Sequence, residues 1–242
     1  KVYLYGIPSY FYYRDGIRKY GFHGLSHRYI SFRLSNILDK PREELKLISC
    51  HLGNGASVCA IDSHKSIDTS MGLTPLEGLM MGTRCGDIDA EAVIYLMARE
   101  GLALHEVTSL LNKHSGLLGI SGVSNDIRTI IREANKGNTN CKNAIEVFCY
   151  RLKKYISAYM GVLNSCDAIV FTAGIGENVP YIRAKTLENM SSLGIKLDSK
   201  KNSDSIGIVS EISSNDSLVK IFVIPTDEEL VIARDTVRIL EK

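Results

Sequence analysis

His51-Leu52-Gly53-Asn54-Gly55 is a glycine-rich turn between two apolar runs, residues 45–50 and residues 56–61. A turn of this kind between two apolar runs predicts a β-hairpin. The tip of the hairpin would present backbone N–H groups with no side chain in the way, which suits an anion such as phosphate. For this segment taken alone, a turn that only reverses the chain is an equal alternative.

Apolar runs and helical patterns continue outward from this turn. Residues 65–70 predict a third strand, and residues 167–172 and 219–224 predict strands that are buried on both faces. Helical spacing of apolar residues occurs at residues 26–38, 91–98, 104–111, 125–135, 144–163, 179–193 and 228–240. Three early strands followed by alternating helices and strands predict an α/β fold with a mixed sheet. We expect one domain over residues 1–242, because the sequence has no internal repeat, low-complexity tract or long linker.

The composition of the 242-residue chain is that of an ordinary globular protein, with 45% hydrophobic and 23% charged residues. The formal net charge is +2 and the basic residues are scattered, so we expect no nucleic acid and no membrane as partner. No apolar stretch approaches the roughly 18–20 residues that span a bilayer. The six cysteines show no C-x-x-C pair and no zinc-ligand spacing, which favours buried thiols in the cytoplasm.

A second glycine-rich segment, Gly174-Ile175-Gly176-Glu177-Asn178, follows the predicted strand at residues 167–172. The end of a buried strand is the place where open α/β sheets bind ligands. The segment lacks the third glycine of the dinucleotide fingerprint. Glu177 and Asn178 could bond ribose hydroxyls or a base edge; a helix cap formed by Asn178 before Pro180 is the alternative.

Arg84 lies between glycines in residues 81–87, on a segment that can approach a ligand closely. Phosphoryl transfer needs positive charge against the transferring group, and arginine supplies it through two parallel donors. A surface arginine in a loop is the alternative. Asp126-Ile127-Arg128 is a further candidate for ligand binding, although Ser124 or Asn125 capping a helix explains this segment equally well.

His23 and His27 are four residues apart, a spacing that can hold a metal on a helix. No glutamate completes the hydrolytic H-E-x-x-H pattern. Because glycines flank His23, it is more plausible as a donor to a ligand, and a core histidine bonded to backbone is the remaining alternative.

Together these segments resemble the acetate kinase family, which includes propionate kinase, within the superfamily of acetate and sugar kinases, heat-shock ATPases and actin. Six blocks in family order carry the resemblance: residues 18–27, 51–55, 68–78, 81–89, 171–178 and 224–230. The resemblance implies a ribonuclease H-like lobe with a mixed sheet flanked by helices.

The resemblance also implies roles for the candidate residues. Residues 51–55 would hold the phosphates of ATP or ADP, and residues 126–128 and 174–178 would hold the nucleoside. His23 and Arg84 would stabilise the transferring phosphoryl group. Phe22 and Pro75 would line the pocket for the alkyl group of the acid, and Glu228 would be the Mg²⁺ carboxylate.

This sequence departs from the family pattern at Leu25, Asp227 and Ala90, where threonine, asparagine and proline are usual. Asp227 adjoins the implied metal carboxylate, so it could perturb metal affinity. The amino-terminal lobe of the family, with its Asn-Ala-Gly-Ser-Ser-Ser loop, has no counterpart in this chain. We therefore expect the carboxy-terminal lobe alone, with residues 1–20 as an inter-lobe segment.

Residues 228–242 would be a terminal helix directed towards the amino-terminal lobe. An apolar stripe on this helix would be exposed or would turn inward without that lobe: Leu230, Ala233, Val237 and Leu240. The implied reaction is the reversible, Mg²⁺-dependent phosphorylation of acetate by ATP, with a homodimer formed through this lobe and little activity in the lobe alone. The alternatives are a propionate kinase and a non-catalytic module that binds nucleotide or drives oligomerisation.

Overall fold

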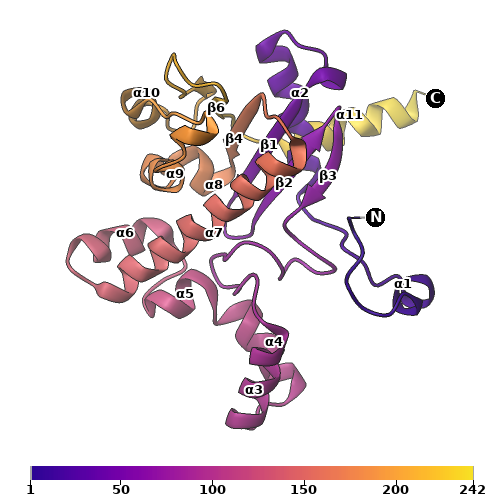
Figure 1. The fold of residues 1–242 in the computed structure, drawn as a ribbon, viewed down its shortest axis with the longest axis vertical. Coiled ribbons are helices and arrows are strands. Elements are labelled where there is room, and N and C mark those ends of the chain that lie inside the picture. The colour runs from indigo at the N-terminus through magenta and orange to yellow at the C-terminus, as the bar shows by residue number, and fades with distance from the viewer. Residues whose placement is uncertain (1, 242) are drawn as a thin grey trace. The chain divides into compact units, whose positions relative to one another are not determined.

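The structure, a computed structural model, describes residues 2–241 and divides into two compact units. The sheet unit comprises Phe22–Leu52, Val58–Thr69 and Ile156–Lys242. The helical unit comprises Lys1–Gly21, Gly53–Ser57 and Ser70–Tyr155. Figure 1 labels most of the elements of both units.

A six-stranded mixed sheet, in the order β3-β2-β1-β4-β6-β5, forms the centre of the sheet unit. Its strands are β1 (Lys46–Leu52), β2 (Ala56–Asp62), β3 (Lys65–Thr69), β4 (Ala168–Thr172), β5 (Ser210–Glu211) and β6 (Lys220–Val223). The predicted mixed sheet is confirmed. The two-residue strand β5 has no counterpart among the predicted strands, because two residues are too few for any periodicity.

The glycine-rich turn is shorter than the sequence predicted, because His51 and Leu52 belong to β1. Only residues 53–55 connect β1 to β2, and the N–H of Gly53 donates to the carbonyl of Gly55 at 3.0 Å. His51 therefore has the fixed orientation of a strand residue.

Parallel pairing brings the carboxyl ends of three strands to one edge of the sheet. β1 pairs with β4 so that His51 lies opposite Thr172, and β4 pairs with β6 so that Phe171 lies opposite Val223. The segments that follow these strands therefore begin close together, as in other open α/β sheets.

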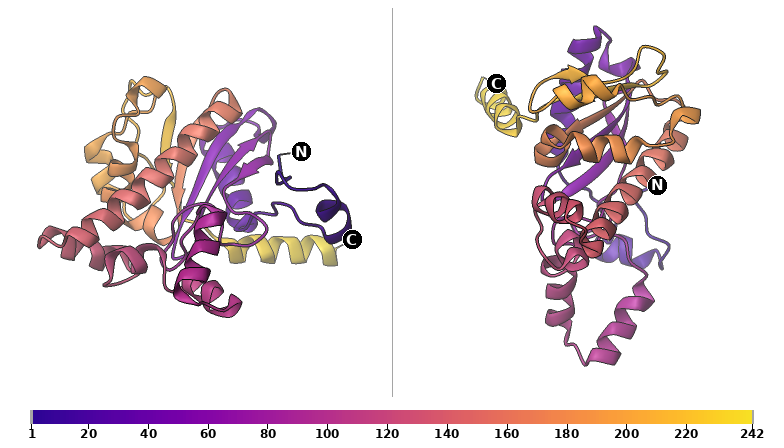
Figure 2. Two further views of the ribbon diagram at one scale, coloured as in Figure 1. Left: turned by 60° about the horizontal axis from the view of Figure 1, so that its bottom comes forward. Right: turned by 90° about the vertical axis from the view of Figure 1, so that its left-hand side faces the viewer.

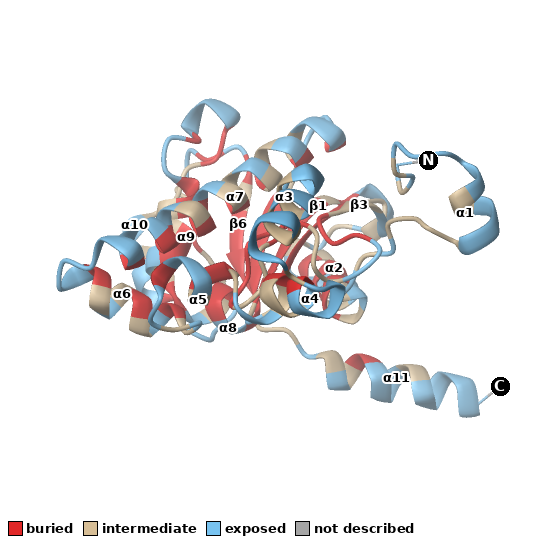
Figure 3. Cartoon of the chain, turned by 90° about the horizontal axis from the view of Figure 1, so that it is seen from below, coloured by how far each residue is buried: buried red, intermediate tan, exposed pale blue. Residues whose placement is uncertain are grey.

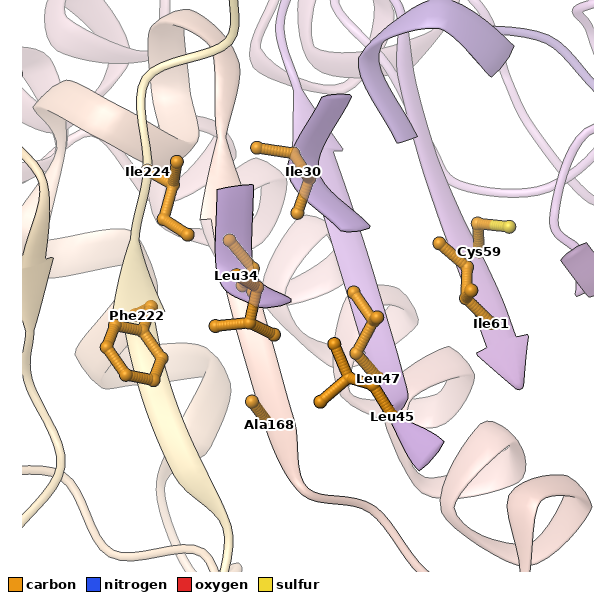
Figure 4. Close-up of a cluster of buried hydrophobic side chains, with 10 residues drawn as sticks. Ile30, Leu34, Leu45, Leu47, Cys59, Ile61, Ala168, Phe222 and Ile224 are labelled. Carbon is orange, nitrogen blue, oxygen red and sulfur yellow. The ribbon is translucent and has the colours of Figure 1, made fainter. Parts of the chain in front are cut away.

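Helix α2 (Gly24–Leu38) packs its apolar side against one face of this sheet (Figure 4). Ile30 and Leu34 of α2 are fully buried against side chains of β1, β2, β4 and β6 and of the segments that flank them. The residues of β1 and β4 that point to the opposite face, such as Ile48 and Ile169, are buried too. Burial on both faces explains why these strands are continuous apolar runs.

The remaining helices of the sheet unit follow β4 and β6. They are α8 (Ala173–Asn178), α9 (Pro180–Leu187), α10 (Ser199–Asp204) and α11 (Glu228–Leu240). One short 3₁₀ turn, Ser191–Leu193, lies between α9 and α10, and another, Arg42–Glu44, precedes β1. Helix α9 contacts both α8 and α10 (Figure 2). The helix predicted over residues 179–193 is confirmed only as far as Leu187, where α9 ends. Glu188 is not helical and Asn189 has a left-handed backbone (φ 59°), so residues 188–193 do not continue the helix.

The helical unit contains α1 (Tyr10–Asp15), α3 (Ala90–Glu100), α4 (Leu104–Lys113), α5 (Gly116–Ser121), α6 (Ile127–Asn135) and most of α7 (Thr139–Leu163). Helix α7 continues into the sheet unit from Ile156. Helix α1 was not predicted; it is short and has no buried residue to give an apolar pattern.

Helix α11 is mostly exposed (Figure 3). The side that carries Val231 and Arg234 lies against α2, where Arg234 stacks over Phe32 and Asp235 pairs with Arg28. On the predicted apolar stripe, Val237 is 52% exposed and Leu240 is 80% exposed. The stripe is therefore exposed from Ala233 onward, as expected for one of the alternatives, while Leu230 is half-buried.

Candidate active site

Three histidines gather at the carboxyl edge of the sheet. His23, at the N-cap of α2, has a left-handed backbone (φ 60°), and its ring stacks on His51 at the end of β1 with centroids 4.0 Å apart. His27 lies one turn further along α2, and its ring is 6.5 Å from that of His23 and 6.3 Å from that of His51. The His23–His27 spacing therefore brings both rings to His51.

The sequence left three alternatives for His23 and His27: a metal site, a donor to a ligand and a core histidine. His27 is a core residue, 5% exposed, and its Nδ1 lies 2.9 Å from the hydroxyl of Ser49. Among the described residues, no group of three or more His, Cys, Asp or Glu side chains could hold a metal ion. His23 and His51 thus remain as the candidate ligand-binding pair.

Burial keeps the imidazoles of His27 and His51 uncharged at neutral pH. It lowers the pKa of His27 to about 3, with further lowering from His51 and His23. Burial also lowers the pKa of His51 to about 3, and His23 adds to the effect. At neutral pH His51 is therefore a neutral imidazole, with one N–H donor and one acceptor.

A chain of hydrogen bonds joins His51 to the segments that follow β4 and β6. Nδ1 of His51 lies 2.8 Å from the hydroxyl of Ser26, and the Thr226 hydroxyl donates to the Ser26 oxygen at 2.9 Å. The N–H of Thr226 donates to the Glu177 carboxylate at 3.1 Å.

Glu177 is the carboxylate at the centre of this edge. One of its oxygens accepts from the backbone N–H of Ala173 at 2.6 Å, from that of Thr226 at 3.1 Å and from the Thr172 hydroxyl at 3.3 Å. Glu177 therefore holds the start of α8 beside the residues that follow β6. The second candidate loop is itself helix α8, and Asn178 donates back to the carbonyl of Gly174 at 3.0 Å rather than capping α9.

Arg183 fixes the end of α8 from the interior. It is fully buried, and one of its terminal nitrogens donates to the carbonyls of Gly176 at 2.8 Å and Glu177 at 3.0 Å. Its other two nitrogens donate to the Asn202 side chain at 2.7 Å, the Asn202 carbonyl at 2.8 Å and the Ser205 carbonyl at 2.6 Å. Burial lowers the pKa of Arg183 to about 10, so the guanidinium stays charged at neutral pH.

Within the helical unit, the structure brings Arg84 and Pro75 together. The Arg84 guanidinium donates to the carbonyl of Pro75 at 3.2 Å and to the sulfur of Met81 at 3.6 Å. Gly116, with φ +63°, lies so close to this loop that an added Cβ would be 2.2 Å from the Met81 carbonyl oxygen. The loop that presents Arg84 is thus packed directly on the start of α5.

The helical unit also brings Asn54 of the turn beside Asn125. The Asn125 side-chain N–H donates to the Asn54 side chain at 3.0 Å, and the N–H of Gly82 donates to the Asn54 carbonyl at 3.0 Å. A side chain at Gly82 would collide with Asn54, because a Cβ there would lie 2.0 Å from its Oδ1. Two segments that the sequence analysis selected separately are therefore neighbours.

The cap of α6 is Asp126, and neither Ser124 nor Asn125 fills that position. Its carboxylate accepts from the Arg128 backbone N–H at 2.9 Å and from the Arg128 side chain at 3.0 and 2.9 Å. These bonds lower the pKa of the Asp126 carboxyl. The Ile127 side chain is buried in the core, so only its backbone remains for contact with a ligand.

Comparison with known proteins gives the family. The model of the acetokinase family matches residues 1–234. The chain belongs to the acetokinase family.

Relatives in this family are similar to the whole chain. Acetate kinase of Halothermothrix orenii is 56% identical over 241 residues, which cover 100% of this chain and 60% of the relative. Acetate kinase of Methanosarcina thermophila is 52% identical over 240 residues, covering 99% of this chain and 59% of the relative. The chain therefore spans about 60% of the length of these relatives.

Solved structures of the family share the fold. Acetate kinase of Porphyromonas gingivalis superimposes with a TM-score of 0.96 at 45% identity, over 99% of this chain and 60% of that protein. A propionate kinase of Francisella tularensis gives a TM-score of 0.91, also at 45% identity, over 96% of this chain and 59% of that protein. These matches confirm the α/β fold class. None of the helices within residues 2–241 is long and apolar enough to cross a bilayer.

The family resemblance also implies site roles for Phe22, which precedes α2, and for Glu228, which begins α11. Phe22 is 38% exposed beside His23 in the sheet unit. Glu228 is the first residue of α11, and Asp227 caps that helix by accepting from the N–H of Leu230 at 2.9 Å. Mg²⁺ is commonly held by one or two carboxylates together with substrate phosphates and water, so a single carboxylate at Glu228 fits a metal shared with nucleotide.

The sequence analysis missed Ser26, Thr226 and Arg183 as parts of the site. The sequence could have revealed Ser26. It lies four positions before Ile30 on α2, so it falls on the buried side of the helix, where a polar side chain needs a partner. Thr226 and Arg183 have no such signal, since their partners are far away in sequence.

The buried histidines predict a stability that depends on pH. Because folding lowers the pKa of His27 and His51 from 6.5 to about 3, the unfolded chain binds more protons between these values. The free energy of unfolding should be constant above roughly pH 7 and fall below pH 6, by up to about 1.4 kcal/mol per pH unit for each histidine. Urea unfolding at a series of pH values measures this slope.

The variant His27→Asn should reduce the slope, and His105→Gln, a change at an exposed residue of α4, should keep it. Equal slopes in the two variants would contradict the assignment of the pH dependence to the buried histidines.

Proposed function

We propose that this chain is the carboxy-terminal, nucleotide-binding lobe of an acetate kinase, which transfers a phosphoryl group reversibly between ATP and acetate. The observation that supports this most strongly is the stacked His23–His51 pair beside α8 at the carboxyl edge of β1, β4 and β6. Identities of 52–56% to acetate kinases over nearly the whole chain support the same activity.

In this proposal the difficulty of the reaction is electrostatic. A carboxylate is already an anion, so it needs little activation by a base, but two anions must approach each other. His23 donates a hydrogen bond to the transferring phosphoryl group and Arg84 supplies a fixed positive charge. Mg²⁺ at Glu228 would neutralise phosphate charge when it is bound.

Nucleotide binding in this proposal uses backbone groups and short polar side chains. Residues 51–55 hold the phosphates, and residues 126–128 and 174–178 hold the nucleoside. The contact between Asn54 and Asn125 supports a common role for the first two segments. Phe22 and Pro75 line the pocket for the alkyl group of the acid.

Propionate kinase is the second candidate, because the propionate kinase of Francisella tularensis is as similar to this chain (45% identity) as the acetate kinase of Porphyromonas gingivalis. A further candidate is a module that binds nucleotide or drives oligomerisation without catalysis. The assays below separate these possibilities.

The first prediction is that the chain binds ADP but transfers phosphoryl groups at a negligible rate by itself. Titration calorimetry with ADP should give a binding isotherm, and His51→Ala should weaken binding by about tenfold because a donor to phosphate is lost. The matched control His64→Ala, in the exposed turn between β2 and β3, should bind normally. No heat of binding at millimolar ADP would contradict the proposal, and turnover at the rate of a whole kinase would contradict the inactivity.

The second prediction concerns Arg84 in a chimeric kinase that joins this chain to the amino-terminal part of the Halothermothrix orenii relative. Arg84→Ala should lower kcat by about 10²–10⁴-fold and change ATP binding little, because the contact is strongest in the transition state. Arg84→Lys should restore activity only in part, since an ammonium lacks the two parallel donors. Arg99→Ala, an exposed change in α3, is the control. Rates with acetate and propionate distinguish the two kinases.

We also propose that the chain forms a homodimer in the cytoplasm. Exposed apolar residues such as Ile94 and Tyr95 of α3 support association. Light scattering at micromolar concentration should give about twice the monomer mass of 26.8 kDa. A mass equal to the monomer would contradict this prediction.

A further inference from the structure

The hydroxyl of Ser26 has two partners and a single proton. Its oxygen accepts the hydroxyl proton of Thr226 at 2.9 Å, and it lies 2.8 Å from Nδ1 of His51. Ser26 is fully buried, and the structure gives it no other side-chain partner among the described residues. A buried hydroxyl proton without an acceptor is costly.

The direction of these bonds determines which nitrogen of His51 is protonated. Because Ser26 accepts from Thr226, its own proton is available for Nδ1 of His51, which then must be an unprotonated acceptor. The reverse arrangement, with Nδ1–H donating to Ser26, would leave the Ser26 proton buried without an acceptor. His51 is neutral at pH 7, because burial lowers its pKa to about 3. A neutral ring that accepts at Nδ1 carries its proton on Nε2.

Nε2 is the nitrogen of His51 that remains for a ligand. It has no hydrogen-bond partner among residues 2–241, and it is absent from the enclosed polar atoms that lack a partner in that range. A donor that is neither paired nor enclosed is suited to a phosphate oxygen.

We infer that Ser26 is a positioning residue that holds His51 in its Nε2–H form, with Thr226 orienting the Ser26 hydroxyl, so that the ring donates to a phosphate oxygen of the nucleotide. The inference rests on the proposed function for the identity of the ligand. Glu177 contributes by binding the backbone N–H of Thr226 at 3.1 Å, which fixes the residue that begins the chain of hydrogen bonds. The segment predicted to bind the nucleoside thereby also sets the tautomer of the phosphate-binding histidine.

The test reads the tautomer directly by NMR. The 242-residue chain, labelled with ¹⁵N-histidine and free of nucleotide, is examined by long-range ¹H–¹⁵N correlation at a pH of about 7.5, and a His51→Gln spectrum assigns the His51 signals. We expect a single Nε2–H pattern for His51. A wild-type ring protonated on Nδ1 would overturn the inference, whatever the behaviour of the variants.

Ser26→Ala removes the hydroxyl that donates to Nδ1 of His51. Either nitrogen of the neutral ring can then carry the proton, so a population protonated on Nδ1 should appear in His51. Ser49→Ala is the matched control, because Ser49 lies against His27 rather than His51. It should change the His27 signals and leave those of His51 in place. An unchanged single Nε2–H pattern in Ser26→Ala would overturn the inference.

The affinity for ADP completes the test. If half of the His51 rings carry the proton on Nδ1, the dissociation constant should rise on the order of twofold, because only the competent fraction binds. Ser49→Ala should bind ADP normally. A mixed tautomer in Ser26→Ala with unchanged ADP affinity would overturn the link to phosphate. No binding by the wild-type chain would instead count against the proposed function, and the tautomer pattern would still be measured.

Discussion

Parallel pairing of β1 with β4, and of β4 with β6, is the constraint on which the candidate site depends. It brings the end of β1, the start of α8 and the residues after β6 to one edge, where Glu177 bonds the N–H groups of Ala173 and Thr226. A shift of β4 by one residue against β1 would turn every side chain of the strand to the other face. Both faces are tightly packed, so the shifted side chains would have to fill spaces shaped for residues of other sizes, such as Ala168 and Phe171. The packing of the core thereby disfavours the shift and fixes the register of the site.

Burial also sets the chemistry of the histidines. Two imidazolium rings stacked 4.0 Å apart would repel each other strongly in a site of low dielectric constant, which agrees with a neutral His51 beside His23. In the proposed kinase, Arg84 would supply the positive charge and His51 a neutral hydrogen-bond donor.

The fold could be predicted from the sequence where local pattern decides the structure. The apolar strands, the hairpin and the helical stripe of residues 228–240 follow from the spacing of apolar residues, and the structure confirms them. The same reasoning failed at residues 174–178, where a glycine-rich segment forms helix α8, because the bonds that fold it come from Glu177 and Arg183. The contact between Asn54 and Asn125 also escaped prediction, since nothing local links residues 71 positions apart.

Arg183 is a buried charge whose long-range hydrogen bonds also shape α8. A guanidinium has five N–H donors, and here they meet the carbonyls of Gly176, Glu177, Asn202 and Ser205 and the side chain of Asn202. Five acceptors offset the cost of burying the charge, and a lysine with three donors could not reproduce them. Two of these bonds end on α8, so the conformation of the proposed nucleoside segment depends on a buried cation.

The Arg183 partners Asn202 and Ser205 lie 19 and 22 residues further along the chain. Short-range sequence patterns cannot reveal such partners, because Arg183 of α9 reaches Asn202 and Ser205 only when α9 and α10 pack together.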